Sequence, residues 1–309
     1  MPAPPVVVVV GPTAAGKSDL GIELALALGG EVVNADSMQL YRGMDVGTAK
    51  LSPDERRGVA HHLLDIWSVR EAASVADYQR RARLEVDRLR AGGRVPVLVG
   101  GSGLYVRAVV DRLDFPGTDP ERRALLEAEL AEVGSGALHQ RLAGLDPAAA
   151  AAILPSNGRR IVRALEVIDL TGRPFSASLP DYEPVYDAVV VGVDFDAEQL
   201  DERIGRRVDR MWEQGFVEEV RRLEAEGLRD GVTASRALGY AQVLALLDGR
   251  WDEATARVQT ALATRRFARR QRSWFRRDPR VTWLEGGSPE MVTRAMALVR
   301  ARWSNGPVG

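Results

Sequence analysis

Gly11-Pro12-Thr13-Ala14-Ala15-Gly16-Lys17-Ser18 follows directly after five consecutive valines, Val6–Val10. Such a valine run is typical of a strand that is buried on both faces of a parallel sheet. A helical pattern occupies residues 19–28, so the octapeptide stands between a strand and a helix, which is the setting that a phosphate-binding loop requires. This stretch predicts an α/β fold built on a P-loop, and it predicts binding of a diphosphate or triphosphate.

Each position of the loop has a chemical role in this interpretation. The two glycines let the backbone N–H groups turn toward an anion, and the following helix adds the positive end of its dipole. Lys17 reaches the outer phosphates, and the Ser18 hydroxyl is a candidate ligand of Mg²⁺. An ordinary glycine turn is the alternative, which the Lys-Ser pair disfavours. The predicted diphosphate-binding residues are Gly11, Thr13, Ala14, Ala15, Gly16, Lys17 and Ser18.

The composition places limits on the cellular setting and on the partners. The 309 residues include no cysteine, which excludes disulfides and thiolate metal sites and fits a cytoplasmic protein. The valine run is too short to be a signal peptide or a membrane span, so we expect no membrane association. The net charge is −1, yet residues 265–280 hold eight arginines and one acid, Asp278. This local excess indicates a polyanion site.

Two further segments place polar side chains at the ends of predicted strands. Residues 31–36 read as a second strand, and Asp36 at its carboxyl end should face the same crevice as the phosphate loop, unless it is a turn aspartate. Residues 94–99 read as the next strand, and the glycine-rich turn after it holds Ser102, which could bind an anion or serve tight packing. His61 and His62 are adjacent and would face opposite sides of a strand, so we expect a structural role instead of a metal pair.

The alternation of strands and helices stops near Leu113. Residues 114–120 read as a linker, residues 121–177 contain no strand pattern, and helices are expected at 121–133, 135–144, 147–153 and 158–171. A buried strand returns at 188–193. We therefore expect a parallel sheet with helices on both faces, formed by a core domain of residues 1–113 and 186–309, with an all-helical domain of residues 114–185 inserted into it.

Arginines occur in three places where they could either contact a phosphate or simply form a solvated surface. Arg159, Arg160 and Arg163 crowd the first turns of a predicted helix, where cations oppose the helix dipole. Arg236 precedes a helix and could clamp a diphosphate. In the helix predicted over 264–277, the spacing places Arg265, Arg269, Arg272 and Arg276 on one face, with Phe267 and Trp274 opposite and packed on the core. Because that helix lacks interleaved acids, nucleic acid or phosphate is the favoured ligand of its arginines.

Taken together, these segments resemble the tRNA dimethylallyltransferase (tRNA isopentenyltransferase) family. The likeness runs from Val6 to Leu284, and its specific parts are Asp36-Ser37-Met38-Gln39 and Thr264-Arg265-Arg266-Phe267-Ala268-Arg269-Arg270-Gln271. Further shared segments are 41–45, 47–50, 61–65, 100–105, 159–167 and 239–240. The chain departs from the family pattern at Ser102, where threonine is usual, and at Ser156-Asn157, where Asn-Asp is usual.

The resemblance implies transfer of a dimethylallyl group from dimethylallyl diphosphate to N6 of the adenosine at position 37, 3′-adjacent to the anticodon, in tRNAs that read UNN codons. It implies Mg²⁺ as cofactor, Asp36 as general base, and Ser102 and Arg236 as stabilisers of the leaving diphosphate. The residues implied in tRNA binding are Asp36, Ser37, Met38, Gln39, Arg159, Arg160, Arg163, Arg265, Arg269 and Arg272. The inserted domain would contact the anticodon stem-loop, and we expect a monomer.

Two other functions use some of the same features. A nucleoside or small-molecule kinase would use the same loop with ATP and Mg²⁺ and would turn over ATP without RNA. A nucleotide-dependent switch that docks on RNA would want a guanine-reading Asn-Lys-x-Asp, which does not occur in this sequence. Neither accounts for residues 36–39 or for the inserted domain, so the transferase is the favoured hypothesis.

Overall fold

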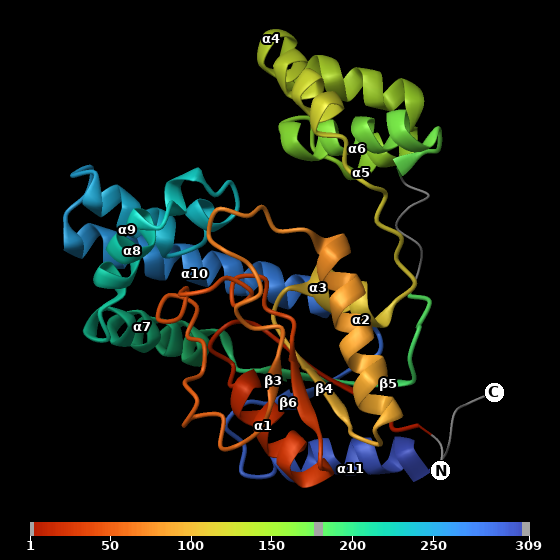
Figure 1. Cartoon of the computed structure of the whole chain (residues 1–309), viewed down its shortest axis with the longest axis vertical. Coiled ribbons are helices and arrows are strands. Elements are labelled where there is room, and N and C mark those ends of the chain that lie inside the picture. The colour runs from red at the N-terminus through yellow and green to blue at the C-terminus, as the bar shows by residue number, and fades with distance from the viewer. Residues whose placement is uncertain (1–2, 176–181, 305–309) are drawn as a thin grey trace. The chain divides into compact units, whose positions relative to one another are not determined.

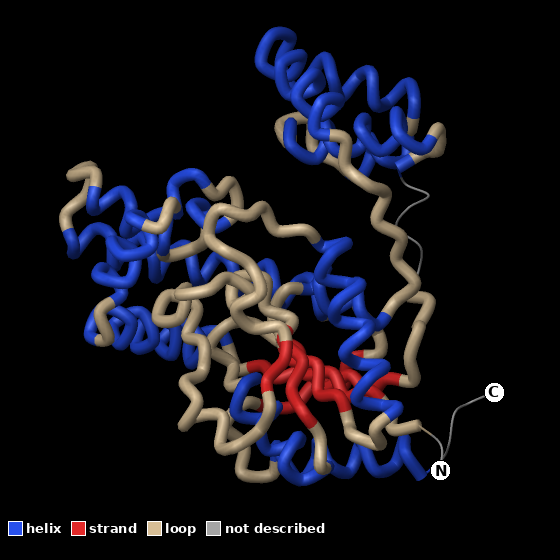
Figure 2. Tube along the Cα trace, in the orientation of Figure 1, coloured by secondary structure: helices blue, strands red, loops and turns tan. Residues whose placement is uncertain are grey.

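A computed structural model describes residues 3–175 and 182–304 of the chain. The chain divides into two compact units, one formed by Met1–Val110 with Pro184–Gly309 and the other by Asp111–Glu183. The first unit carries the sheet and the second is helical (Figures 1 and 2).

The first unit is built on a parallel sheet with the strand order β3-β2-β4-β1-β5-β6. Its strands are β1 (Val6–Val10), β2 (Glu31–Asn34), β3 (His61–His62), β4 (Pro96–Val99), β5 (Ala188–Asp194) and β6 (Val281–Glu285). The predicted parallel α/β sheet is confirmed. Because β4 lies between β1 and β2, the carboxyl ends of these three neighbouring strands bring the phosphate loop, the second glycine-rich turn and Asp36 to one edge.

The valines of β1 divide the core into two layers, as the period of two in a strand requires. Val6, Val8 and Val10 pack in a cluster with side chains of α2 and α3, whereas Val7 and Val9 pack in a cluster with side chains of α1 and α11 on the other face. All five valines are fully buried. Helices therefore cover both faces of the sheet, as expected.

The helices of the first unit include two at the segments where the sequence predicts them, residues 19–28 and 264–277. The helices of this unit are α1 (Lys17–Leu28), α2 (Val75–Ala91), α3 (Gly103–Val110), α7 (Ala197–Glu213), α8 (Phe216–Ala225), α9 (Tyr240–Leu247), α10 (Glu253–Phe275) and α11 (Met291–Ser304), with 3₁₀ turns η2 (Leu228–Asp230) and η3 (Ala234–Arg236). Ser74 caps α2 by accepting a hydrogen bond from the Asp77 N–H. The largest difference is at α10, which begins eleven residues before the predicted start at 264.

The prediction that Trp274 packs on the core is wrong. The buried positions of α10 include Thr264, Ala268, Gln271 and Phe275, which repeat at helical spacing and define a different face. The Trp274 side chain is 44% exposed, and its indole lies against Gly103, where an added Cβ would come within 2.1 Å of the indole nitrogen.

The second unit has a core of its own. Its helices are α4 (Pro120–Leu145), α5 (Pro147–Ala152) and α6 (Gly158–Thr171), and the first of them is interrupted at Gly134, which has φ 80° and ψ 165°. This kink separates the two helices that the sequence predicts there. Leu126, Leu138, Leu142, Ile161 and Leu165 form the centre of the core. In the part of the chain that the structure describes, no helix has the length and apolar character needed to cross a membrane.

Candidate active site

The phosphate loop takes backbone conformations that favour glycine at both of its glycine positions, Gly11 and Gly16. Gly11 and Gly16 have φ values of 146° and 85°, and Ala14 also lies at positive φ, 64°. Gly11 is required for a second reason, because a Cβ there would come within 2.2 Å of the Val193 carbonyl oxygen. Gly16 stands in the left-handed region immediately before α1, so the loop leads directly into the positive end of that helix.

Lys17 lies at the start of α1 with its ammonium close to the loop. The Nζ atom donates a hydrogen bond to the Pro12 carbonyl oxygen at 2.7 Å. Burial lowers the pKa of Lys17 to about 8, and the negative charge of Asp36 acts in the opposite direction and favours the ammonium. The electrostatic coupling places the lysine and the carboxylate in the same site.

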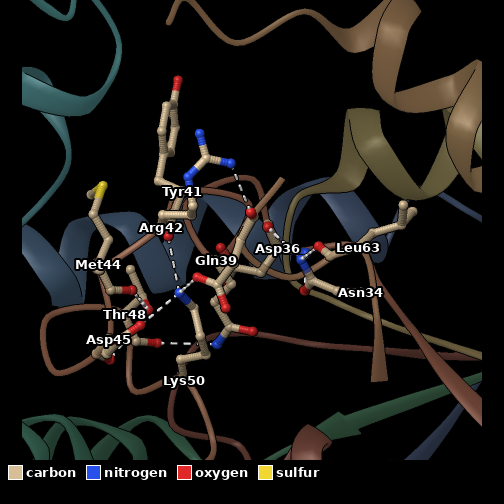
Figure 3. A network of polar contacts seen from close by, with 12 residues as sticks. Asn34, Asp36, Gln39, Tyr41, Arg42, Met44, Asp45, Thr48, Lys50 and Leu63 are labelled. Carbon is tan, nitrogen blue, oxygen red and sulfur yellow. Dashed lines mark hydrogen bonds and ion pairs between the residues drawn. The ribbon is translucent and has the colours of Figure 1, made fainter. Parts of the chain in front are cut away.

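Asp36 is held in place by the buried side chain of Asn34. The Asn34 amide accepts a hydrogen bond from the Asp36 N–H at 2.9 Å and donates to the carbonyl oxygens of Asp36 and Leu63, both at 3.1 Å (Figure 3). Asp36 Oδ1 then accepts from the Met38 N–H at 2.9 Å. Among the described residues no hydrogen-bond donor to Asp36 Oδ2 is found, so this oxygen is available to accept a proton.

The second glycine-rich turn is joined to the segment that follows Asp36. The Ser102 hydroxyl oxygen accepts a hydrogen bond from the Ser37 N–H at 3.2 Å, and the two serine hydroxyls are 3.1 Å apart. The structure therefore brings Ser102 next to Ser37, at the Asp36 side of the site.

Gln271 of α10 joins this turn to the phosphate loop, a role that the sequence does not reveal. Its carboxamide oxygen accepts a hydrogen bond from the Thr13 N–H, and its nitrogen donates to the Gly101 carbonyl oxygen, both at 2.9 Å. The side chain is 6% exposed. The glutamine thus acts as a buried strut between the two loops.

The arginines of α7 also reach the site and were missed. Arg203 Nε donates to the Ala14 carbonyl oxygen at 2.8 Å, and Arg207 Nη2 donates to the Thr48 carbonyl oxygen at 3.0 Å. Burial lowers the pKa of Arg207, whereas Asp36 favours its charged form. A signal was present in the sequence, since Arg203, Arg206, Arg207 and Arg210 recur at helical spacing and form one face of the helix.

These residues line one pocket at the carboxyl ends of the strands. Its phosphate end includes Thr13, Lys17 and Ser18. Its other polar lining residues are Asn34, Asp36, Gln39, Thr48, Arg207 and Gln271. The remaining lining side chains are apolar or neutral and include Val32, Leu51, His61, Leu64 and Val99. A second pocket, lined by Ala14, Gly16, Lys17 and Ser18 together with the four arginines of α7, adjoins it. The combination suits a substrate with an anionic head and a small apolar tail, placed beside a carboxylate.

Arg236 lies outside the two pockets described above. It belongs to η3, and its side chain is exposed. A contact between Arg236 and a diphosphate stays a prediction, whereas Arg207 lines both pockets.

The arginines of α10 differ in their partners. Arg272 donates to Asp194 Oδ1 at 2.7 Å, Arg276 lies 3.3 Å from the other oxygen of Asp194, and Arg265 lies 3.8 Å from Asp201. Residues 264–277 themselves hold no interleaved acids, as the sequence shows, but β5 and α7 supply acidic partners to three of these arginines. Arg269 is exposed and has no ion-pair partner among the described residues.

The arginines of the second unit also divide into two kinds. Arg159 and Arg160 are exposed. Arg163 donates to Glu166 at 2.8 Å and to the carbonyl oxygens of Pro116 and Gly117 at 2.7 and 3.2 Å. Because the Glu166 side chain is fully buried, Arg163 supplies a charge that the fold of this unit needs.

The two histidines have separate environments, as expected for neighbours in a strand. His61 lines the pocket, and its Nδ1 lies 2.9 Å from the Val59 carbonyl oxygen, while burial lowers the pKa of its ring. His62 lies 2.6 Å from Glu31 and 3.1 Å from Glu85, away from the pocket. No cluster of three or more His, Cys, Asp or Glu side chains suited to a metal ion occurs in residues 3–175 and 182–304.

Comparison with known sequences gives a consistent result. The family model described as IPP transferase matches residues 39–278. The chain is 69% identical over 300 residues to the tRNA dimethylallyltransferase of Streptomyces griseus subsp. griseus, covering 96% of each chain. It is 66% identical over 299 residues to the protein of the same name from Thermobifida fusca, covering 95% of this chain and 94% of the other.

Solved structures agree. The chain is similar to the full-length tRNA isopentenylpyrophosphate transferase of Bacillus halodurans, with a TM-score of 0.72 and 39% identity over 97% of this chain and 98% of that one. A eukaryotic dimethylallyltransferase that acts on tRNA superposes with a TM-score of 0.85 over 99% of this chain and 81% of that one. At 24% identity, the second comparison supports the fold alone.

Proposed function

The chain belongs to the IPP transferase family, and from this premise we propose that it transfers a dimethylallyl group from dimethylallyl diphosphate to N6 of adenosine 37 in tRNAs that read UNN codons. The names of the relatives, tRNA dimethylallyltransferase and tRNA isopentenylpyrophosphate transferase, support a tRNA-modifying prenyltransferase. Their substrate, a tRNA, also fits a cytoplasmic enzyme.

One observation carries the chemistry. A phosphate-binding loop and a carboxylate with an available oxygen line the same pocket. A kinase needs the loop to deliver a phosphoryl group, whereas here the loop would hold the leaving group. The carbon–oxygen bond of the allylic diphosphate breaks, a carbon–nitrogen bond to N6 forms, the N6 proton goes to Asp36, and diphosphate departs.

The chain supplies two forms of assistance to this reaction. An adenine amino group is a weak nucleophile, so positioning beside Asp36 and transfer of its proton contribute to the rate. Negative charge accumulates on the diphosphate as the bond breaks, and we propose that the loop N–H groups, Lys17 and Arg207 stabilise it, which their presence in the lining of the two pockets supports. Ser102 and Arg236 stay proposed contributors of the same kind.

Mg²⁺ fits the residues at the phosphate end of the pocket. The Ser18 hydroxyl lines this end, and oxygen ligands of this kind together with substrate phosphates are what Mg²⁺ prefers. When bound, the ion would neutralise part of the diphosphate charge.

The RNA side of the proposal uses exposed arginines. Adenosine 37 must leave the stack of the anticodon loop to reach the pocket, at a cost of a few kcal/mol that contacts in the site offset. Ser37, Met38 and Gln39 follow Asp36 and are proposed to contact this adenosine. Arg159 and Arg160 are proposed to bind the backbone of the anticodon stem-loop.

The test is a transfer assay with dimethylallyl diphosphate labelled at C1, Mg²⁺ and an unmodified tRNA transcript that reads a UNN codon. We expect label in the RNA, and N6-(dimethylallyl)adenosine after nuclease digestion. A transcript with guanosine at position 37 is the matched control and should stay unlabelled. The proposal fails if the RNA stays unlabelled while the terminal phosphate of ATP passes to a small acceptor.

A further inference from the structure

Lysine is rare in this chain. Of the 42 basic residues, two are lysines, Lys17 and Lys50, and all the others are arginines. Lys17 belongs to the phosphate loop, where a compact point charge suits a phosphate. A chain that uses arginine almost everywhere else has a lysine at position 50, which suggests that this position needs an ammonium group and not merely a positive charge.

The surroundings of Lys50 explain that need. Its side chain is 3% exposed, and Nζ donates to the Tyr41 carbonyl oxygen at 3.0 Å, to Asp45 Oδ1 at 2.7 Å and to Asp65 Oδ1 at 2.6 Å (Figure 3). All three N–H bonds of the ammonium are thus used. A guanidinium is planar and larger, so it does not fit three acceptors that converge on one small donor. Two carboxylates offset the cost of burying the charge.

The contacts of Lys50 close the loop formed by residues 41–50. The Lys50 N–H donates to the Asp45 carbonyl oxygen at 2.9 Å, and the Thr48 hydroxyl donates to the Met44 carbonyl oxygen at 2.7 Å. These two hydrogen bonds hold Thr48 and Lys50 against residues 44 and 45, and they therefore fix the position of the Thr48 carbonyl group.

That carbonyl oxygen has two donors from different parts of the pocket. Gln39 Nε2 lies 3.2 Å from it, and Arg207 Nη2 lies 3.0 Å from it. Gln39 belongs to the segment proposed to contact the adenosine, and Arg207 borders the phosphate loop. One backbone oxygen therefore orients a side chain on each substrate's side of the pocket.

A buried glutamate holds the same loop from the opposite side. Glu219 of α8 is 6% exposed and accepts hydrogen bonds from the N–H groups of Asp45, Val46 and Gly47 at 2.7–3.1 Å, and from the Tyr240 hydroxyl at 2.6 Å. Glu219 thus anchors the loop to α8 and α9. The backbone groups that Glu219 binds belong to residues 45–47. Lys50 fixes the position of residues 48–50 relative to Tyr41 and Asp65.

We propose that Lys50 is a positioning residue of the reaction, whose ammonium fixes the Thr48 carbonyl oxygen so that Gln39 and Arg207 are aligned on the adenosine and the diphosphate at the same time. This role rests on the proposed function. Lys50 is absent from the residues that line the pocket of Asp36, so it acts through Thr48 and not on a substrate.

The experiment compares Lys50→Met and Lys50→Arg with the wild-type enzyme in steady-state transfer assays, at a temperature where circular dichroism shows each protein folded. We expect kcat to fall at least about tenfold in both variants, since misaligned groups lose much of their catalytic effect. Arg57→Met is the matched control. It removes an exposed cation, seven residues after Lys50, that pairs with Glu23, and it should leave kcat and both KM values unchanged.

A double-mutant cycle separates positioning from a purely structural role. Gln39→Ala should cost about tenfold in kcat/KM in the wild-type background and less than about twofold in the Lys50→Met background, because the alignment is already lost. Equal costs in the two backgrounds, or kinetic constants of Lys50→Met within twofold of wild type, would overturn the proposal. If Lys50→Met does not fold, Asp65→Asn, which leaves Asp45 as a partner, enters the same cycle. An inactive wild-type enzyme would instead contradict the proposed function.

Discussion

The Gln271 carboxamide accepts a hydrogen bond from the Thr13 N–H at 2.9 Å, although 258 residues separate the two along the chain. The same side chain donates to the Gly101 carbonyl oxygen, and an added Cβ at Gly101 would come within 2.3 Å of its nitrogen. The spacing between the phosphate loop and the second glycine-rich turn is therefore set by one side chain of α10.

Gln271→Leu should weaken diphosphate binding as well as stability. Removing both hydrogen bonds leaves the part-buried Thr13 N–H and the buried Gly101 carbonyl without these partners, and the loss of the buried one costs about 1–3 kcal/mol. We expect the KM for dimethylallyl diphosphate to rise by about tenfold and the melting temperature to fall. Steady-state kinetics and thermal unfolding measure the two effects. Ser273→Ala, which changes an exposed residue on the same helix, should alter neither quantity. An unchanged KM in Gln271→Leu would show that the two hydrogen bonds of Gln271 contribute to stability alone.

Binding of dimethylallyl diphosphate should take up a proton above pH 8. The pKa of Lys17 is lowered to about 8 by burial, so the free enzyme loses this charge as the pH rises through 8, and the anionic ligand restores it. Affinity should then fall about tenfold per pH unit above this value. Calorimetry without tRNA, in buffers of different ionisation enthalpy, measures the uptake. Lys17→Arg stays charged, so uptake that persists in this variant would assign the proton to another group.

The same shift has a definite sign for stability. Because the folded pKa lies below the ordinary value of 10.5, the unfolded chain holds the Lys17 proton more tightly between about pH 8 and 10.5. The contribution of this group to the free energy of unfolding therefore rises with pH across that window. Chemical denaturation of wild type and Lys17→Met at several pH values isolates it.

Asp36→Asn tests the general base without disturbing the turn. Asparagine keeps an oxygen that can accept the Met38 N–H, so the local hydrogen bond survives while the carboxylate is lost. We expect kcat to fall about 10²–10⁴-fold, the range typical of a general base, with tRNA affinity nearly unchanged. Single-turnover transfer and filter binding measure the two quantities. Turnover near the wild-type rate would remove Asp36 from the base role.

How far the sequence could predict this site depends on the range of each interaction. Strand β1, the phosphate loop and the start of α1 are contiguous, so their pattern is readable from neighbouring residues. Asp36 and Ser102 are predictable because carboxyl ends of parallel strands meet at one edge. In contrast, Arg203 contacts Ala14 across 189 residues, and Arg272 pairs with Asp194 across 78. No local pattern indicates which face of α7 or α10 turns toward the loop. This is why the sequence predicts a buried Trp274, although the structure leaves that side chain 44% exposed.

Arg207, and not Arg236, should carry the larger share of diphosphate binding. Arg207 borders the phosphate loop and is oriented by Thr48, whereas Arg236 is exposed and outside both pockets. Arg207→Ala should raise the KM for dimethylallyl diphosphate by at least about tenfold, as expected for loss of a charge-assisted contact. Arg236→Ala should change it less than about twofold. Steady-state kinetics with dimethylallyl diphosphate varied at saturating tRNA measure both KM values. A larger increase in KM for Arg236→Ala than for Arg207→Ala would assign the diphosphate contact to Arg236.

Arg269 and Arg272 lie three residues apart on α10 but should respond differently to substitution. Arg269 is exposed, so its proposed contact is with an RNA phosphate, and Arg269→Ala should weaken tRNA binding and reduce the slope of log K against log salt by about one. Arg272 is 19% exposed and is the closer of the two arginines that pair with Asp194, so Arg272→Ala leaves this carboxylate with the more distant Arg276 alone and should mainly lower the melting temperature. Filter binding across a salt series, with thermal unfolding of the same proteins, separates the two. A salt slope that falls in Arg272→Ala and not in Arg269→Ala would reverse the assignment.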